Sequence, residues 1–167
     1  MSQAKIQACI IGWPVAHSRS PLIHGYWLKK YGIDGSYVRR PVRPEEAADF
    51  FRHMREENLA GCNVTIPHKA AAFAAAEKKS DAARAMGVAN TLWFEGDRLC
   101  ADNTDGAGFV RHLRASVPKF GAGGSAVVVL GAGGGARGVI HAMLEAGAPE
   151  VRIFNRTRDR ADVVARH

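Results

Sequence analysis

The chain has 167 residues, of which 47% are hydrophobic, 8% aromatic and 23% charged, with 18 glycines and 7 prolines. This composition is typical of a globular protein and excludes a collagen-like or wholly disordered chain. The length suits one ordinary domain or two small ones, and no segment approaches the roughly 20 apolar residues that span a bilayer. The first residues lack the pattern of a signal peptide, so we expect a soluble, cytoplasmic protein.

The net charge of +7, from 23 Lys and Arg against 16 Asp and Glu, attracts anions. However, the tightest arginine group (Arg39, Arg40 and Arg43) is interrupted by prolines, and no nucleic-acid-binding motif is present. We therefore expect a small anionic ligand and no nucleic acid. The three cysteines and seven histidines lack the spacing of a zinc site or a disulfide framework, which predicts reduced, packed thiols and no metal.

Apolar runs and helical patterns alternate along the chain. Strands are predicted at residues 5–11, 36–42 and 62–66, each followed by a helix: near 21–31, from Pro44 to about Asn58, and from Pro67 onward. Residues 89–95 and 98–102 form a predicted hairpin around Gly96-Asp97, and 108–117 an amphipathic helix. After a glycine-rich connection at 118–125 come a strand to Leu130, a glycine turn, a helix at 138–147, a strand at 151–154 and a helix from Asp159.

This alternation predicts an α/β fold with mostly parallel strand pairing. A doubly wound dinucleotide-binding domain uses two βαβαβ halves, whereas the segment after Val127 has room for only two strands. We therefore expect only the first part of such a domain in this chain, as in a truncated piece or part of a longer polypeptide.

The segment GAGGGA follows an apolar strand and opens a helix, as in a dinucleotide-binding turn. In the register Gly131-x-Gly133-x-x-Ala136, the first glycine permits the turn, the second allows close approach of a pyrophosphate, and the small third residue lets the helix pack. A second register, Gly133-x-Gly135-x-x-Gly138, also fits. We prefer the first because the strand ends at Leu130. The predicted cradle for the pyrophosphate consists of Gly131, Ala132, Gly133, Gly134 and Gly135.

The next strand ends at Phe154, where NAD-binding folds place an acidic residue for the ribose 2′-hydroxyl. A basic segment follows here instead: Asn155, Arg156, Thr157, Arg158, Asp159 and Arg160. Guanidinium and hydroxyl groups suit a 2′-phosphate, which a carboxylate would repel. The sequence therefore predicts NADP rather than NAD.

Three polar clusters stand at predicted strand ends, where open α/β sheets gather ligands. The first, His17-Ser18-Arg19-Ser20, places two hydroxyls before a helix, where they can hold a carboxylate; as a lone feature, Ser20 would be interpreted as a helix cap.

The second cluster runs from Asn63 to Lys69 and includes Thr65. Its lysine lies in the first turn of a helix, where the helix dipole should lower its pKa and favour proton transfer. The third cluster, Asn103-Thr104-Asp105, is accompanied by Asn90-Thr91 on the hairpin. An aspartate at a helix start is most often a cap, but beside Lys69 it would complete an acid–base couple.

Taken in order and spacing, GWPVAHSRSPLIH, NVTIPHK, ANT, NTDG, GAGGGARG and NRT resemble shikimate dehydrogenase over the entire chain. The resemblance implies a substrate-binding and catalytic α/β domain at 1–104 and the first part of a Rossmann NADP-binding domain at 105–167. It also implies reversible NADPH-dependent reduction of 3-dehydroshikimate to shikimate, in the shikimate pathway to aromatic amino acids.

The resemblance also implies residue roles. Ser18 and Ser20 would bind the substrate carboxylate, and Lys69, paired with Asp105, would be the acid/base. Thr65, Asn90 and Asp105 would hold ring hydroxyls, with Asn63 and Thr104 lining the same pocket. Asp81 would lie near the nicotinamide end of the cofactor. Later family helices, including one that contributes a glutamine to the substrate, have no counterpart in this sequence.

Two alternatives stay open. One is the quinate/shikimate dehydrogenase type, usually NAD-linked, against which the Ser18-x-Ser20 pair and the lack of an acidic residue at 155–158 argue. The other is a non-catalytic nucleotide-binding module or fragment, which would have no need for both Lys69 and Asp105. The expected partners are a small-molecule substrate and NADP, with no membrane and no nucleic acid; a homodimer is compatible with the sequence.

Overall fold

The structure, a computed structural model, describes residues 5–121 and 124–166 and divides into two compact units. Unit 1 runs to Ser80 and includes Ala89–Asp102. Unit 2 consists of Asp81–Val88 and the chain from Asn103 onward. The boundary expected between residues 104 and 105 lies two residues beyond the last crossing between the units.

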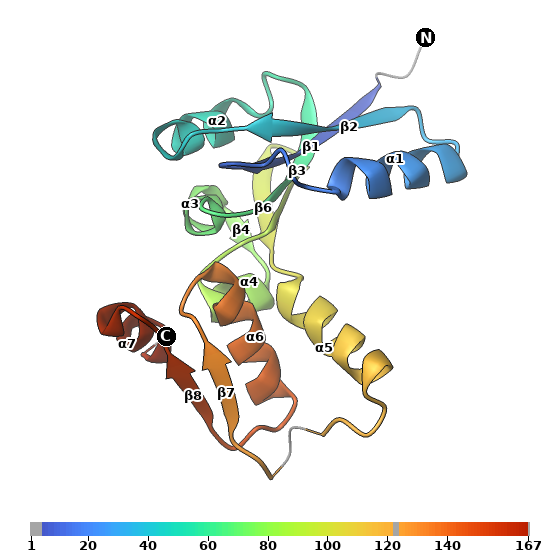
Figure 1. Ribbon diagram of the computed structural model, residues 1–167. Helices are drawn as coiled ribbons and strands as arrows, with labels where there is room; N and C mark the ends of the chain where they lie inside the picture. The colour runs from blue at the N-terminus through green and yellow to red at the C-terminus, as the bar shows by residue number, and fades with distance from the viewer. Residues whose placement is uncertain (1–4, 122–123, 167) are drawn as a thin grey trace. The chain divides into compact units, whose positions relative to one another are not determined.

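Unit 1 is a six-stranded sheet with helices packed on it (Figure 1). Helix α1 contacts β1 and β2, α2 packs against α3, and α3 contacts β6. The elements are β1 (Ile6–Gly12), α1 (Ser20–Lys30), β2 (Gly35–Pro41), the 3-10 helix η1 (Pro44–Glu46), α2 (Ala47–His53), β3 (Leu59–Val64), α3 (Lys69–Ala75), β4 (Lys78–Lys79), β5 (Thr91–Glu95) and β6 (Arg98–Asp102).

The sheet order is β2-β1-β3-β5-β6-β4. Strand β1 pairs in parallel with β2 and β3, and β4 pairs in parallel with β6, while β5 is antiparallel to both β3 and β6. Strands β1, β3 and β6 therefore end at the same edge of the sheet, and β5 begins there. This edge is formed by the ends of strands and not by an outer strand. This arrangement confirms the α/β fold and the mostly parallel pairing.

The core of unit 1 lies between this sheet and helices α2 and α3. Ile11, Val64 and Leu92 are almost completely buried on neighbouring strands, and Phe51 and Met54 fill the helix side. Apolar runs of the kind found at residues 8–11 are typical of strands covered on both faces, which explains why their positions could be predicted.

In its described residues, unit 2 contains a parallel two-stranded sheet and four helices (Figure 1). Its core forms around Met143, with Val110, Val127 and Val151 packed on it. The elements are α4 (Asp81–Met86), α5 (Asp105–Ser116), β7 (Val127–Leu130), α6 (Gly134–Glu145), β8 (Val151–Phe154) and α7 (Arg158–Ala165).

Helices α5 and α6 approach each other closely where two glycines face one another. A Cβ atom built on Gly106 would lie 2.7 Å from the carbonyl oxygen of Gly138 and 3.1 Å from Cβ of Ala142. A Cβ on Gly138 would lie 3.1 Å from Cβ of Asp105. The glycine of the NTDG motif is therefore required by packing.

Several predicted bounds differ from the structure. The strand expected at 62–66 is β3, which ends at Val64, and the helices expected at 108–117 and 138–147 are α5 and α6, which begin at Asp105 and Gly134. The helix expected from Pro44 to about Asn58 is a 3-10 turn followed by α2, which ends at His53. The chain turns instead at Asn58, where φ is +55° and the amide of Leu59 donates to the carbonyl of Met54. The helix expected from Pro67 begins at Lys69.

The three cysteines, Cys9, Cys62 and Cys100, are buried and free, as expected for packed thiols. Within residues 5–121 and 124–166, no three His, Cys, Asp or Glu side chains group as metal ligands. Among the same residues, no helix has the length and apolarity needed to cross a membrane.

Candidate functional site

The first candidate site lies in unit 1, at the edge where β1, β3 and β6 end. After β1 the chain carries Ser18 in the loop and Ser20 at the start of α1. After β3 it carries Thr65 in the turn and Lys69 at the start of α3. Asn90 directly precedes β5 at the same edge, because Thr91 is the register partner of Asn63. The substrate-site residues predicted within unit 1 thus gather at one edge of its sheet.

The two serines form a preorganised hydroxyl pair. The Ser18 hydroxyl donates to Oγ of Ser20 at 3.2 Å and accepts the Ser20 backbone N–H at 3.3 Å. Ser20 is the first residue of α1, whose first turn has no acidic side chain. Hydroxyl groups at the start of a helix offer hydrogen bonds to an anion such as a carboxylate.

Asn63 is held by a residue that sequence reasoning missed. The Tyr37 hydroxyl on β2 donates to Oδ1 of Asn63 at 2.6 Å, and Nδ2 of Asn63 donates to Oγ1 of Thr91 at 3.2 Å. The Thr91 hydroxyl in turn donates to Oδ1 of Asn90 at 2.9 Å. Because Oδ1 of Asn63 accepts from Tyr37 and Nδ2 of Asn63 donates to Thr91, these bonds fix which end of the Asn63 amide faces each partner.

Burial affects two groups in this network. The imidazole of His24 stacks on the Tyr37 ring, with 3.9 Å between centroids and 3° between planes. Desolvation raises the pKa of Tyr37 well above its usual range and lowers the pKa of His24. Tyr37 therefore remains a neutral hydrogen-bond donor, and burial favours the neutral form of His24.

The turn after β3 delivers Lys69 to the start of α3. The amide of Thr65 donates to the carbonyl of Ile11 at 2.9 Å, and the amide of His68 donates to the carbonyl of Thr65 at 3.0 Å. His68 is buried, and its Nε2 lies 2.7 Å from the carbonyl oxygen of Val42. The half-buried Lys69 is thus carried by a turn anchored on both sides.

The Asn103-Thr104-Asp105 segment belongs to unit 2. Asn103 is buried; its Nδ2 donates to the carbonyl of Val88 at 3.0 Å and its Oδ1 accepts the Asp105 amide at 3.1 Å. Asp105 is the first residue of α5, and the exposed Thr104 precedes it. Because Lys69 and Asp105 lie in different units, their pairing stays a prediction.

The predicted phosphate cradle has the required backbone. Strand β7 ends at Leu130, Gly131 has φ of +115°, and the extended Gly133 caps α6, which has no side-chain cap and no acidic residue in its first turn. Nothing lies within 4 Å of a Cβ atom built at Gly131, Gly133 or Gly135.

The glycine with positive φ is therefore Gly131, the first glycine of the preferred register Gly131-x-Gly133-x-x-Ala136. The close-packed glycine is Gly138 of the other register, which meets α5.

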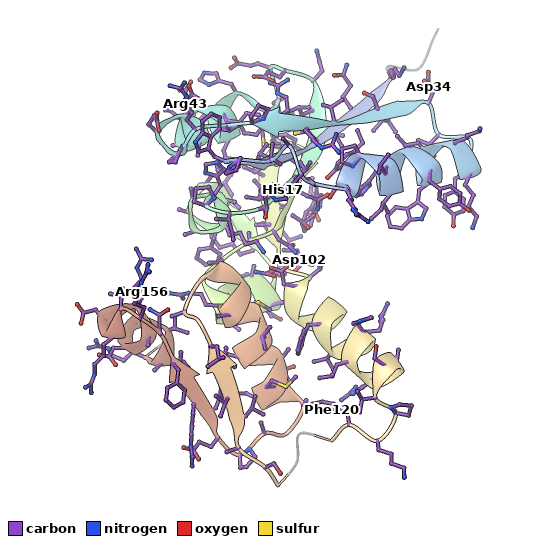
Figure 2. The ribbon with its side chains drawn as sticks, in the orientation of Figure 1. His17, Asp34, Arg43, Asp102, Phe120 and Arg156 are labelled. Carbon is purple, nitrogen blue, oxygen red and sulfur yellow. The ribbon has the colours of Figure 1, made fainter. Side chains whose placement is uncertain are left out.

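The basic segment follows β8. Nδ2 of Asn155 donates to the carbonyl of Thr157 at 2.6 Å, and Nε of Arg158 lies 3.8 Å from Asp162. Arg156 is exposed beside the start of α7 (Figure 2) and forms no ion pair with any described residue. Thr157, Asp159 and Arg160 are exposed as well, and so is Asp81, which lies at the start of α4.

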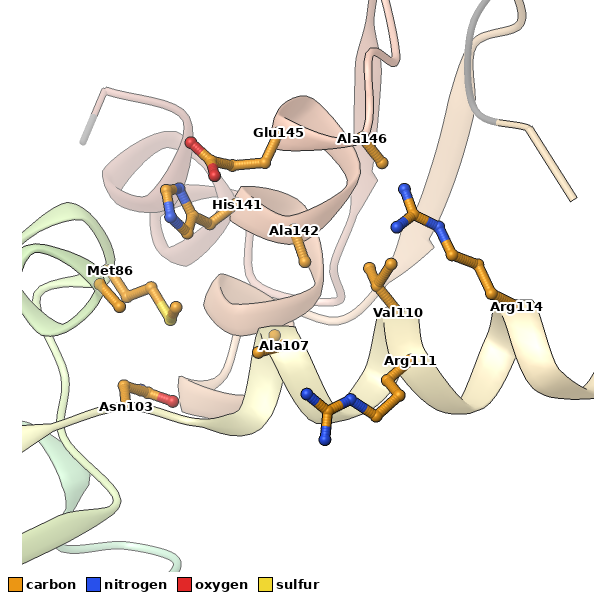
Figure 3. Close-up of a pocket in the computed structure, with 12 residues that line it drawn as sticks. Met86, Asn103, Ala107, Val110, Arg111, Arg114, His141, Ala142, Glu145 and Ala146 are labelled. Atoms are coloured by element: carbon orange, nitrogen blue, oxygen red, sulfur yellow. The ribbon is translucent and has the colours of Figure 1, made fainter.

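A cavity of about 550 Å³ in unit 2 contains few of the predicted site residues. It opens between α4, α5 and α6 and is lined by Met86, Val110, Arg111 and His141 (Figure 3). Of the predicted residues only Asn103 reaches it, and both ends of that amide are already bonded within unit 2.

Two family models match the chain. The model of the shikimate dehydrogenase substrate binding domain matches residues 10–92. The model of shikimate / quinate 5-dehydrogenase matches residues 116–167. The two matched ranges fall before and after the NTDG segment.

Individual relatives and solved structures similar to this chain include shikimate dehydrogenases as well. The shikimate dehydrogenase (NADP(+)) of Brucella abortus (strain S19) is 52% identical over 161 residues, which are 96% of this chain and 55% of the relative. The crystal structure of the Aquifex aeolicus shikimate dehydrogenase superposes with a TM-score of 0.90 at 30% identity, over 99% of this chain and 61% of that one. The Thermus thermophilus enzyme, solved with NADP(H) and shikimate, gives 0.84 at 37% identity, over 96% and 60%. The chain thus spans about half the length of the curated relatives it matches.

Proposed function

We propose, because the chain belongs to the shikimate dehydrogenase family, that it takes part in the reversible NADP-dependent reduction of 3-dehydroshikimate to shikimate. Unit 1 supplies the substrate site and unit 2 the first part of the NADP site. The observation that carries this proposal is the single sheet edge that holds Ser18, Ser20, Thr65, Lys69 and Asn90. It offers hydroxyls for a carboxylate, an amide and a hydroxyl for ring hydroxyls, and one ammonium group.

The residues of unit 2 fit NADP. The open backbone at Gly131, Gly133 and Gly135 leaves room for a pyrophosphate at the start of α6. This helix start has no side-chain cap, and the helix dipole favours an anion there. The exposed guanidinium of Arg156 suits the 2′-phosphate of NADP. The cofactor, when bound, supplies the hydride that reduces the substrate carbonyl.

The proposed work of unit 1 is binding and proton transfer. Ser18 and Ser20 orient the substrate through its carboxylate. Thr65, Asn90 and Asp105 hold its ring hydroxyls, and Asn63 and Thr104 line the same pocket. Lys69 donates a proton to the carbonyl oxygen during reduction and takes it back during oxidation, and Asp105 is its proposed partner. Asp81 is proposed at the nicotinamide end. A homodimer in the cytoplasm is the proposed setting.

The test measures binding on the chain of this sequence and turnover on the polypeptide that contains it. We expect shikimate and NADP to bind, measured by calorimetry, and NADPH to form from NADP and shikimate. Lys69→Ala should lower turnover about 10²–10⁴-fold with nearly unchanged shikimate affinity. The control Lys29→Ala, in the last turn of α1, should change neither.

The outcomes separate the alternatives. Binding of neither shikimate nor NADP would overturn the proposal. Preference for quinate and NAD would favour the quinate/shikimate type. Binding of NADP with full indifference to shikimate would favour a nucleotide-binding module.

A further inference from the structure

One arginine of unit 1 has a contact that no motif indicated. The guanidinium of Arg39, on the edge strand β2, donates twice to the carbonyl oxygen of Ser18, through Nε at 2.8 Å and through Nη2. The contact joins two segments that are 21 residues apart in the sequence. The accepting residue, Ser18, also carries one of the two hydroxyls proposed to bind the substrate carboxylate.

This contact restrains the serine loop. The carbonyl of Ser18 belongs to the peptide that leads through Arg19 to Ser20, so clamping it limits rotation between the two hydroxyls. On the N-terminal side of the same residue, the amide of Ser18 donates to the carbonyl of Val15. Arg39 thus restrains the backbone on the C-terminal side of Ser18, which connects Ser18 to Ser20.

The charge of Arg39 is also uncompensated. Its neighbour Arg40 pairs with Glu57, whereas Arg39 forms no ion pair with any residue that the structure describes. Only two of the five N–H donors of its guanidinium are used on Ser18. A positive group with donors to spare therefore lies beside two hydroxyls, which carry no charge of their own.

The position on β2 fits a role at the site. Alternate residues of a strand share a face, so Tyr37 and Arg39 point to the same side of the sheet. Tyr37 holds Asn63 and Arg39 holds Ser18. Strand β2 thereby contributes hydrogen bonds that hold two residues of the proposed substrate site, Asn63 and Ser18.

We propose that Arg39 is a positioning residue that sets the Ser18–Ser20 hydroxyl pair and gives this site its preference for a charged carboxylate. The inference rests on the proposed function for the identity of the substrate. Its positioning part depends only on the contact with Ser18.

The binding test uses two probes, shikimate and shikimate methyl ester, which differ in the negative charge. We expect Arg39→Gln to weaken shikimate binding about five- to tenfold, the scale of one charge-assisted contact at a partly exposed site. It should weaken ester binding by a smaller factor, since the ester still contacts the displaced hydroxyls but carries no charge. Arg39→Lys should recover part of the shikimate affinity, since it keeps the charge but loses the paired donors. The matched control, Arg40→Gln, should change neither affinity.

The positioning test uses the backbone amide signals of residues 17–21 in NMR spectra without ligand. Arg39→Gln should shift or broaden these signals, and Arg40→Gln should not. Equal loss of affinity for both probes, or unchanged shikimate binding in Arg39→Gln, would overturn the proposed charge preference. Unchanged amide signals would overturn the positioning. A wild-type chain that binds neither probe refutes the proposed function and the charge preference with it, whereas the amide signals still decide whether Arg39 sets the loop.

Discussion

Replacing Gly106 by alanine tests the close approach of α5 and α6. The added Cβ would lie 2.7 Å from the carbonyl oxygen of Gly138, a backbone atom that cannot rotate away, and 3.1 Å from Cβ of Ala142. The two helices must therefore move apart by several tenths of an ångström, at the expense of the contacts around Met143.

The magnitude follows from two opposing effects. Overpacking costs about 1–3 kcal/mol, whereas the change from glycine to alanine inside a helix gains about 1 kcal/mol. The difference between these two effects is an expected loss of about 0–2 kcal/mol for Gly106→Ala. Gly108→Ala is the matched control, two residues along the same helix, with nothing within 4 Å of its added Cβ. It should stabilise the protein by about 1 kcal/mol.

The assay is urea unfolding followed by far-UV circular dichroism, which detects the helices of both units, α5 and α6 included. Tryptophan fluorescence follows unit 1 separately, because Trp13, Trp27 and Trp93 all lie there. The circular-dichroism midpoint of Gly106→Ala should fall below that of the wild type and the midpoint of Gly108→Ala should rise above it. Equal stability of Gly106→Ala and Gly108→Ala would refute the close packing of the two helices at this point.

Three further predictions concern other parts of the chain. Arg156→Asp should shift cofactor preference from NADP toward NAD in binding assays, and Arg114→Asp, on α5, should not; an unchanged ratio in the first would contradict the assignment of the 155–160 segment. Because burial lowers the pKa of His24, its stabilising contribution is complete above the ordinary value of 6.5 and is lost as the pH falls through the lowered pKa; urea unfolding at decreasing pH should show this loss, and His24→Gln should lack it. Leu92→Ala, at a side chain only 1% exposed, should cost about 2–5 kcal/mol, whereas Leu22→Ala, 70% exposed, should change thermal stability little.

The sequence predicts best the features that local pattern controls. The strand expected at 151–154 is β8, and the hairpin around Gly96-Asp97 is β5 and β6. Pro67 does place Lys69 at the start of a helix. These features depend on runs of apolar residues or on glycine and proline, whose effects are local.

The unpredicted features depend on contacts between distant residues. Helix α4 has six residues, too few for a periodic signal, and is fixed by the burial of Ala83 and Met86. The hydrogen bonds of Tyr37 and Arg39 cross 26 and 21 residues. No motif carries such contacts, although alternation along β2 places both residues on one face. The turn at Asn58 was detectable, because asparagine tolerates positive φ.

The two sheets differ in how their outer strands face solvent. In the six-stranded sheet, one outer strand carries Arg39 and Arg40 and ends at Pro41, and the other, β4, has two residues. Charge, proline and shortness all discourage the addition of a foreign strand.

Strands β7 and β8, by contrast, each pair with a single strand among the described residues. Val128 and Leu130 of β7 are 56% and 82% exposed, and Phe154 of β8 is 59% exposed. Open backbone groups next to apolar side chains form a template for intermolecular pairing. A further strand, from the same polypeptide or from another, should therefore add at β7 or β8, and Val128→Lys should disfavour that pairing.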